Sequence, residues 1–166
     1  MSDEDLYLSE AVMEVAQAEQ KLKETYKDIK EYKSENMNID LMAGLLIDLP
    51  YNIYIKNIEL FNTTDKISLI KKKTKIIEDN VSQDINKIEE LKNQAQRDSE
   101  QRRQLLGNET YQLLERATSL NERIKGLLQA QSFYYENLFS SIKIRYRQAT
   151  AVLINDRKLQ EAIAND

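Results

Sequence analysis

Carboxylates are the residues in this 166-residue chain whose spacing comes nearest to a chemical site. Carboxylates that converge from several helices into a water-excluding pocket can hold Mg²⁺ or Mn²⁺ and support metal-assisted hydrolysis. In this sequence, however, the acids mostly alternate with Lys and Gln, a pattern typical of a solvated helix face. We therefore expect no metal site and no cofactor. The carboxylate pairs that are expected to lie near one another on helices are Glu10 with Glu14, Glu31 with Glu35, and Asp79 with Asp84.

Other common catalytic side chains are missing from the composition. The sequence contains no His and no Cys. These absences exclude a Ser-His-Asp triad, thiol catalysis, disulfides and Cys-ligated metal centres. We therefore expect a protein that is not an enzyme, with no catalytic residues and no small-molecule substrate.

Basic residues form two local clusters in a chain that is acidic overall. Lys and Arg number 24 against 28 Asp and Glu, which gives a formal net charge of −4. Phosphate backbones and anionic lipids attract positive surfaces, so nucleic acid and membranes are not the expected partners. The lysine cluster lies beside Ile70 and Ile77 and is expected to occupy outer helix faces. The two clusters are Lys71, Lys72, Lys73 and Lys75, and Lys143, Arg145 and Arg147 with Tyr146.

The sequence shows no targeting signal and no membrane span. Its first ten residues are acidic and polar, which is unlike a secretory signal peptide. The longest apolar stretch, 42–60, is interrupted by charged residues and by Pro50, whereas a membrane span needs about 20 apolar residues. We expect a cytoplasmic protein, or a component of a particle assembled in the cytosol.

Apolar residues recur at alternating spacings of three and four along much of the chain, which is typical of coiled-coil helices. This pattern predicts helices over 3–36, 65–106 and 109–164, with Gly107 either ending the second helix or lying inside a longer one. The polar seam residues Glu19 and Asp84, together with Gln131, are expected to fix the helix register. The predicted seam residues are Leu8, Val12, Val15, Leu22, Tyr26, Ile29, Ile67, Ile70, Ile77, Val81, Ile88, Leu91, Leu113, Leu120, Ile124, Leu127, Leu138 and Ile142.

The segment 37–63 interrupts this pattern. It contains Gly44 and Pro50, the only proline in the chain, and proline disrupts a helix interior. A short apolar helix is expected to stop before Pro50. The β-branched and aromatic residues 52–58 then favour a short strand or an extended connector.

The order of a helix, the stretch 52–69 and a second helix is similar to that of prefoldin-type chaperone subunits. The segments 52–56 and 64–69 resemble the first strands of the β-hairpin region that this family carries between two coiled-coil arms. The resemblance implies a hairpin in this part of the chain and a chaperone-like helical module.

Two groups of large apolar residues are wider than a helix seam and are predicted to bind a partner. The aromatic group on 133–139 is expected either to pack under the 37–63 segment or to anchor another protein. The second group lies within the 37–63 segment, where it exceeds what a surface loop tolerates. The predicted partner-binding residues are Leu45, Leu46, Leu49, Tyr51, Tyr54, Phe133, Tyr134, Tyr135 and Phe139.

Together these patterns predict an all-α protein with a single elongated domain over 1–166. The expected architecture is a coiled coil or helical bundle of about three long helices, with a short irregular or β-like insert near 37–63. The predicted function is a non-enzymatic scaffold subunit of a larger protein assembly, either a hetero-assembly or a homo-oligomer. The alternatives are a structural or assembly component of a virus or phage particle, a membrane-surface module, and the chaperone-like module.

Overall fold

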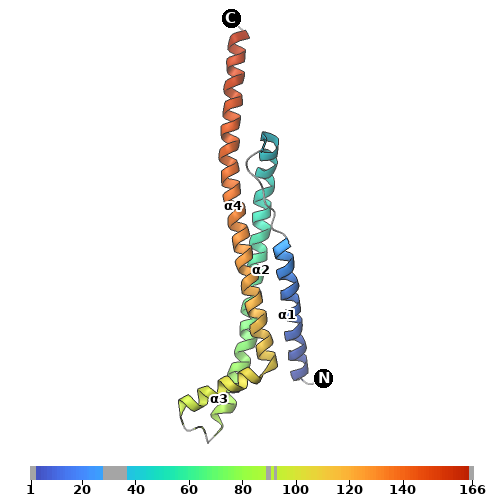
Figure 1. Cartoon of the computed structure of the whole chain (residues 1–166), viewed down its shortest axis with the longest axis vertical. Helices are drawn as coiled ribbons and strands as arrows, with labels where there is room; N and C mark the ends of the chain where they lie inside the picture. Colours follow the sequence, from blue (N-terminus) through green and yellow to red (C-terminus); the bar gives the residue numbers. More distant parts are fainter. Residues whose placement is uncertain (1–2, 28–36, 89–90, 92, 165–166) are drawn as a thin grey trace. The chain divides into compact units, whose positions relative to one another are not determined.

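The computed structural model describes residues 3–27, 37–88, 91 and 93–164. Across these residues the regular structure is four α-helices, with no strand, so the all-α prediction is confirmed. The prediction of about three helices is corrected to four, because residues after Asn86 leave the helix before a new one begins. The part of the predicted first helix over 28–36, including Ile29, lies outside the described residues. The helices are α1 (Asp3–Lys27), α2 (Ile39–Asn86), α3 (Gln94–Gly107) and α4 (Glu109–Ala164) (Figure 1).

The helices belong to two compact units. Unit 1 contains α1, the part of α2 from Leu60 onward, α3 and the part of α4 up to Leu127. Unit 2 contains the part of α2 up to Glu59 and the part of α4 from Leu128 onward. Each unit has a hydrophobic cluster of its own, and each cluster takes side chains from both α2 and α4.

Helix α2 passes without interruption through the segment expected to break it. Asn38 caps its start by accepting a hydrogen bond from the backbone N–H of Leu41 at 2.8 Å. The β-like insert near 37–63 and the helix end before Pro50 were therefore wrong, as was a helix over 65–106, because α2 runs from Ile39 to Asn86. The segments 52–56 and 64–69, which resemble prefoldin hairpin strands, are helical too.

The inner seam of α2, which is the row of residues on its buried side, includes two polar residues, so an apolar pattern does not reveal that it is continuous. The alternation of four and three continues from Leu49 through the predicted insert to Ile67. At two of these positions, however, stand Lys56 and Thr63, each only 8% exposed. A search for apolar residues alone therefore misses the repeat at these two positions, although the helix continues through them. The positions are Leu49, Ile53, Lys56, Leu60, Thr63 and Ile67.

Pro50 is tolerated because of the face on which it lies. Its ring is exposed, whereas its neighbour Leu49 is completely buried. Proline cannot donate a hydrogen bond to the carbonyl four residues earlier, at a cost of about 3 kcal/mol. Water can bond that carbonyl on an exposed face, and the burial of Leu45 and Leu49 offsets the remaining cost.

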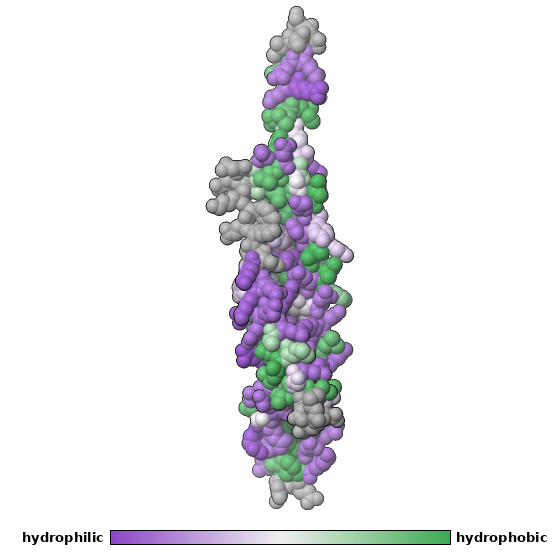
Figure 2. Space-filling view, turned by 90° about the vertical axis from the view of Figure 1, so that its right-hand side faces the viewer, coloured by the Kyte–Doolittle hydropathy of each residue, from purple (hydrophilic) through white to green (hydrophobic). Residues whose placement is uncertain are grey.

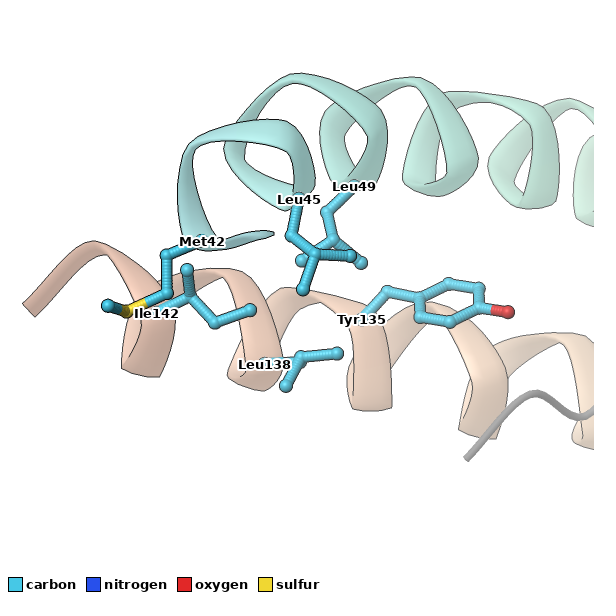
Figure 3. Close-up of a cluster of buried hydrophobic side chains, with 6 residues drawn as sticks. All are labelled: Met42, Leu45, Leu49, Tyr135, Leu138 and Ile142. Atoms are coloured by element: carbon cyan, nitrogen blue, oxygen red, sulfur yellow. The ribbon is translucent and has the colours of Figure 1, made fainter. Parts of the chain in front are cut away.

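The core of unit 2 joins α2 to α4. Figure 3 shows side chains of α2 pointing toward side chains of α4, with Leu49 and Tyr135 among them. Beside this core, the Ser132 hydroxyl of α4 donates to the Asn57 Oδ1 atom of α2 at 2.9 Å. The six buried residues are Met42, Leu45, Leu49, Tyr135, Leu138 and Ile142.

In unit 1, α1 turns small residues toward α2 and α4. Ala11 and Ala18 are each 1% exposed, whereas the predicted seam residues Val12 and Tyr26 are 51% and 50% exposed. Alanine allows two helix backbones to approach closely, so the face with alanines packs better than the neighbouring face with larger side chains. The cluster consists of Ala11 and Val15 of α1, Ile70 of α2, and Leu114 and Ala117 of α4.

Ion pairs flank the helix contacts of unit 1. Glu14 and Glu10 of α1 each lie 2.9 Å from a lysine of α2, Lys66 and Lys73 respectively. Glu19 of α1 lies 2.5 Å from Arg116 of α4. Glu19, expected in the seam, therefore lies at its edge, because Ala18 occupies the buried position.

The inner seam of α4 includes positions beside several of the predicted ones. Ile124, Leu138 and Ile142 are buried, whereas Leu113, Leu120 and Leu127 are half-buried at its edge. Elsewhere, Ile67 and Ile70 are buried, and Leu8, Leu22, Ile77 and Val81 are half-buried. Ile88 and Leu91 lie outside the helices, and Asp84 is exposed while Ile85 takes the buried position. The buried α4 residues are Leu114, Ala117, Asn121, Ile124, Leu128, Gln131, Ser132, Tyr135, Leu138 and Ile142.

Several buried polar side chains are satisfied within their own helix. The hydroxyls of Thr25 and Thr74 donate to the carbonyls of Lys21 and Ile70, at 2.8 and 3.1 Å. The Asn121 amide donates likewise to the Ala117 carbonyl at 2.8 Å. Because each bond goes back one turn, it satisfies the buried polar group without requiring a partner from another helix for that bond.

Asparagines mark both ends of α3. The Asn93 side chain accepts a hydrogen bond from the Gln96 N–H at 2.9 Å and caps its start. At the other end, α3 stops at Gly107, and the Asn108 side chain accepts from the Tyr111 N–H at 2.8 Å. The structure therefore shows that Gly107 ends a helix and does not lie inside a longer one.

Replacing Leu49 tests the core of unit 2. Leu49→Ala is expected to lower the free energy of unfolding by about 2–5 kcal/mol, because it leaves a cavity at a fully buried site. Ile144→Ala removes a side chain of similar size that is 57% exposed, and should cost less than about 1 kcal/mol. Urea unfolding followed by circular dichroism measures both, and equal losses would contradict the assigned core.

Replacing Pro50 tests the continuity of α2. Pro50→Ala restores a backbone donor inside a helix and is expected to raise the free energy of unfolding by about 1–3 kcal/mol. Gly44→Ala is the matched control, because an added Cβ meets nothing within 4 Å and should stabilise by about 0.5–1 kcal/mol. If thermal unfolding shows stabilisation by Gly44→Ala but destabilisation by Pro50→Ala, the helix does not continue through Pro50.

A hydrogen-bonded carboxylate in α3 predicts an unusual titration. The Arg103 guanidinium donates to both carboxylate oxygens of Glu100, at 2.5 and 2.8 Å, and Gln104 donates at 2.9 Å. These bonds, chiefly those from Arg103, lower the pKa of Glu100 to about 2. The pair therefore stabilises the folded chain above the ordinary Glu pKa of about 4.3, and this contribution is lost as the pH falls through about 2.

NMR titration of the Glu100 carboxyl carbon measures this pKa directly. In the wild type we expect the midpoint near the low value, and in Arg103→Gln a rise toward about 4.3. Arg102→Gln, which removes a neighbouring guanidinium, should leave the midpoint unchanged. A wild-type midpoint near about 4 would contradict the bidentate pair.

Candidate functional site

The face of α2 opposite the unit 2 core carries a row of exposed apolar side chains, which we name the outer stripe. It consists of Ile47, Tyr51, Tyr54 and Ile58, which are 75%, 64%, 61% and 39% exposed. Their spacings of four, three and four keep them on one side of a helix. At about 100° per residue, this side lies about 160° around the helix axis from Leu49 and its core neighbours.

The outer stripe gives α2 a second apolar face where a surface helix normally has a polar one. Two charged residues, Asp48 and Lys56, stand between Ile47 and Ile58 in the sequence. Lys56 is buried on the core side of α2 and bonds Glu59 at 3.2 Å, so it does not contribute charge to the stripe. The stripe is therefore an apolar surface with almost no charge.

The structure divides the nine predicted partner-binding residues into three groups. Leu45, Leu49 and Tyr135 are buried in the unit 2 core, so they are not accessible to a partner in this conformation. Leu46 and Phe139 pack against that core and are partly buried. Four residues are accessible: Tyr51 and Tyr54 on the outer stripe, and Phe133 and Tyr134 on α4, at 66% and 40% exposure.

The sequence interpretation missed Ile47 and Ile58. The signal was present, because both lie at helical spacing from Tyr51 and Tyr54. It could not be used while 37–63 was interpreted as an interrupted segment, since only a continuous helix aligns the four residues on one face. Because the helix was expected to stop before Pro50, Ile47 and Ile58 were not recognised as members of the stripe.

Tyr135 shows how the aromatic group on α4 is divided. Its ring packs against α2 in the unit 2 core, and the Tyr134 ring lies beside it with centroids 5.7 Å apart. Phe139 lies under the Lys143 ammonium, 6.0 Å from the ring centroid. The group therefore packs partly under α2 and leaves Phe133 as an isolated exposed ring.

Exposed apolar residues also lie near the end of α4, but they do not form a face. On the side shown in Figure 2, hydrophobic patches interrupt a largely hydrophilic surface. Val152, Leu153 and Ile154 are each more than half exposed. Three consecutive helical residues point about 100° apart, so these three spread around the helix, and Leu159, which is 64% exposed, shares a side with Val152 alone.

Unit 1 contains a cleft of about 480 Å³ between α1, α2 and the start of α4. Ala11, Ile77 and Leu114 form part of its lining. Its Glu10 and Lys73 side chains lie 2.9 Å apart and neutralise each other. The cleft therefore presents a mainly apolar surface with an ion pair at its lining.

The lysine cluster of α2 is largely paired with acids. Lys71 lies 3.0 Å from Glu122, and Lys75 lies 2.9 Å from Asp79. The pKa of Lys75 is raised, first by its hydrogen bond to Asp79 and then by that carboxylate's charge. This region is therefore a mixed surface and not a strongly positive patch.

No protein-family model, no curated protein and no solved structure matches this chain. Among the residues that the structure describes, no three acidic side chains form a group that could hold a metal ion. None of the helices, as far as their residues are described, has a segment long and apolar enough to cross a membrane. The outer stripe is therefore the surface on which we base a functional proposal.

Proposed function

We propose that this chain is a non-enzymatic scaffold subunit that enters a protein assembly through helix–helix pairing. The observation that carries the proposal is the outer stripe of α2, a row of four exposed apolar residues on the side opposite the unit 2 core. We place this assembly in the cytosol or in a particle formed there.

The geometry of the stripe is the geometry of a coiled-coil seam. Alternating spacings of three and four align side chains so that each can insert between residues of a facing helix. The inner face of α2 already uses this alternation against α4. The outer stripe repeats it with large residues that have no covering helix among the described parts of the chain.

The tyrosines give the stripe most of its binding capacity. Each buries about 150–250 Å² when covered, while its hydroxyl can stay in contact with water at the interface edge. Covering the exposed parts of Tyr51 and Tyr54 is worth on the order of 6 kcal/mol at about 25 cal/mol per Å². This gain is available to offset the entropy lost on association.

A photo-crosslinking residue at position 54 tests this proposal in the cells that make the protein. Tyr54 replaced by the photoreactive residue is expected to give a defined covalent adduct with a protein chain. The matched control is the same residue at Gln83, which is exposed on α2. Its neighbours one turn away on the same helix are the polar residues Asp79, Asn80 and Asn86, so no defined adduct is expected there.

A second substitution connects the adduct to the stripe. Ile58→Asp should reduce the adduct at position 54 at least about tenfold, because losing one buried Ile contact costs about 1.5–3 kcal/mol. Circular dichroism should show unchanged helix content in this variant. Absence of an adduct at position 54, or identical adducts from positions 54 and 83, would contradict the proposed function.

A further inference from the structure

We propose that the partner of the outer stripe is a second copy of this chain, with α2 packed antiparallel against α2. The two-fold axis would cross α2 between Asn52 and Ile53. This inference rests on the proposed function, since it names the occupant of the same surface.

Within unit 2 the outer stripe has the same order in both directions. Its residues are Ile, Tyr, Tyr and Ile, and its spacings are four, three and four. Phe61, which is 65% exposed three residues after Ile58, belongs to unit 1. A two-fold interface must be self-complementary, because residue i of one copy contacts residue j of the other and the reverse. About the proposed axis, Ile47 faces Ile58 of the second copy, and Tyr51 faces Tyr54 of the second copy.

The exposure of the stripe favours the antiparallel orientation. Accessibility falls along the stripe, from 75% at Ile47 to 39% at Ile58. An antiparallel pair places the most accessible residue of one copy against the least accessible residue of the other, so the exposed area covered is similar at both ends of the contact. A parallel pair would place the two Ile58 residues together, where only 39% of each residue is available to be covered.

The charges around the outer stripe also favour a second copy. Self-association brings identical surfaces together, so any charge in the contact faces its own kind. The outer stripe has no charged member. Asp48 and Glu59 directly follow its two end residues, and Glu59 is paired with Lys56 at 3.2 Å. In the antiparallel pair the two Asp48 residues lie nine positions apart along the axis, about 14 Å, which avoids close repulsion. The outer stripe itself has no charged side chains that could pair with a charged partner.

The area of the outer stripe sets the expected strength of the dimer. With about 150–200 Å² for each side chain, the exposed parts of the four residues on both copies amount to on the order of 800 Å². Stable interfaces bury about 1,200–2,000 Å², and smaller ones are weak and transient. We therefore expect a reversible dimer with a dissociation constant on the order of micromolar.

Single-cysteine crosslinking tests both the partner and the orientation. The chain has no Cys, so Ile47→Cys and Ile58→Cys each introduce the only thiol. In the antiparallel dimer these two positions face each other, so a mixture of the variants, distinguished by a size tag, should give the mixed disulfide. Each variant alone should not, because identical positions lie about 17 Å apart along the axis, beyond disulfide reach.

The alternative outcomes overturn the proposal in different ways. A disulfide formed by Ile47→Cys alone, without the mixed product, would show a parallel pair and overturn the antiparallel arrangement. No disulfide in any mixture would overturn the second copy as occupant. Lys72→Cys mixed with Ile47→Cys is the control for random collision and should give no product.

Analytical ultracentrifugation of the unmodified chain gives an independent measurement. The average mass should rise with concentration from 19.4 kDa toward twice that value. Tyr51→Glu with Tyr54→Glu should weaken the dimer at least about tenfold. Phe133→Glu changes an exposed ring outside the stripe and should leave the dimer unchanged.

The two proposals fail separately. A chain that stays monomeric at every concentration, yet still forms a defined adduct with a different protein through position 54, overturns the second copy and leaves the scaffold function standing. A monomeric chain with no adduct at position 54 overturns both.

Discussion

The burial of the inner face of α2 against α4 in unit 2 is the interaction from which the outer stripe follows. Leu49 is fully buried at the position next to Pro50, and Leu45 and Tyr135 close the same core. This burial keeps the helix continuous through a residue that removes one of its hydrogen bonds. Continuity in turn aligns residues 47–58 on one outer face. If the helix ended at Pro50, Ile47 and Tyr51 would belong to different elements and no outer stripe would exist.

The helices combine apolar contacts with polar groups that do not compete with them. Thr74 and Asn121 bond carbonyls of their own helices and so remain in the seams without polar partners across the interface. In unit 1, acidic residues of α1 pair with basic residues of α2 and α4 along the edges of the contact. Exposed ion pairs of this kind add little to stability, but like charges in the same places would oppose the arrangement.

Helical character was predictable from the sequence over most of the chain, whereas the inward face was predictable only in part. In α2 and α4, branched apolar residues such as Ile70 and Ile142 indicate buried positions directly. In α1, the buried residues include Ala11 and Ala18, which carry little weight in an apolar pattern. Their advantage is close approach between backbones, and this depends on the shape of the neighbouring helices. The accessible tyrosines of the stripe were recognised by type, but their alignment with Ile47 was not.

The sequence by itself determined the class of regular structure and the chemistry that the chain lacks. A repeat of threes and fours requires helices, and a chain without His or Cys has no imidazole or thiol to place in a site. Only the tertiary structure decided that Pro50 lies inside a helix, that Leu45 faces inward and that Tyr54 faces outward. The physical reason is that backbone propensity acts locally, whereas burial free energy is summed over all the side chains that two helices bring together.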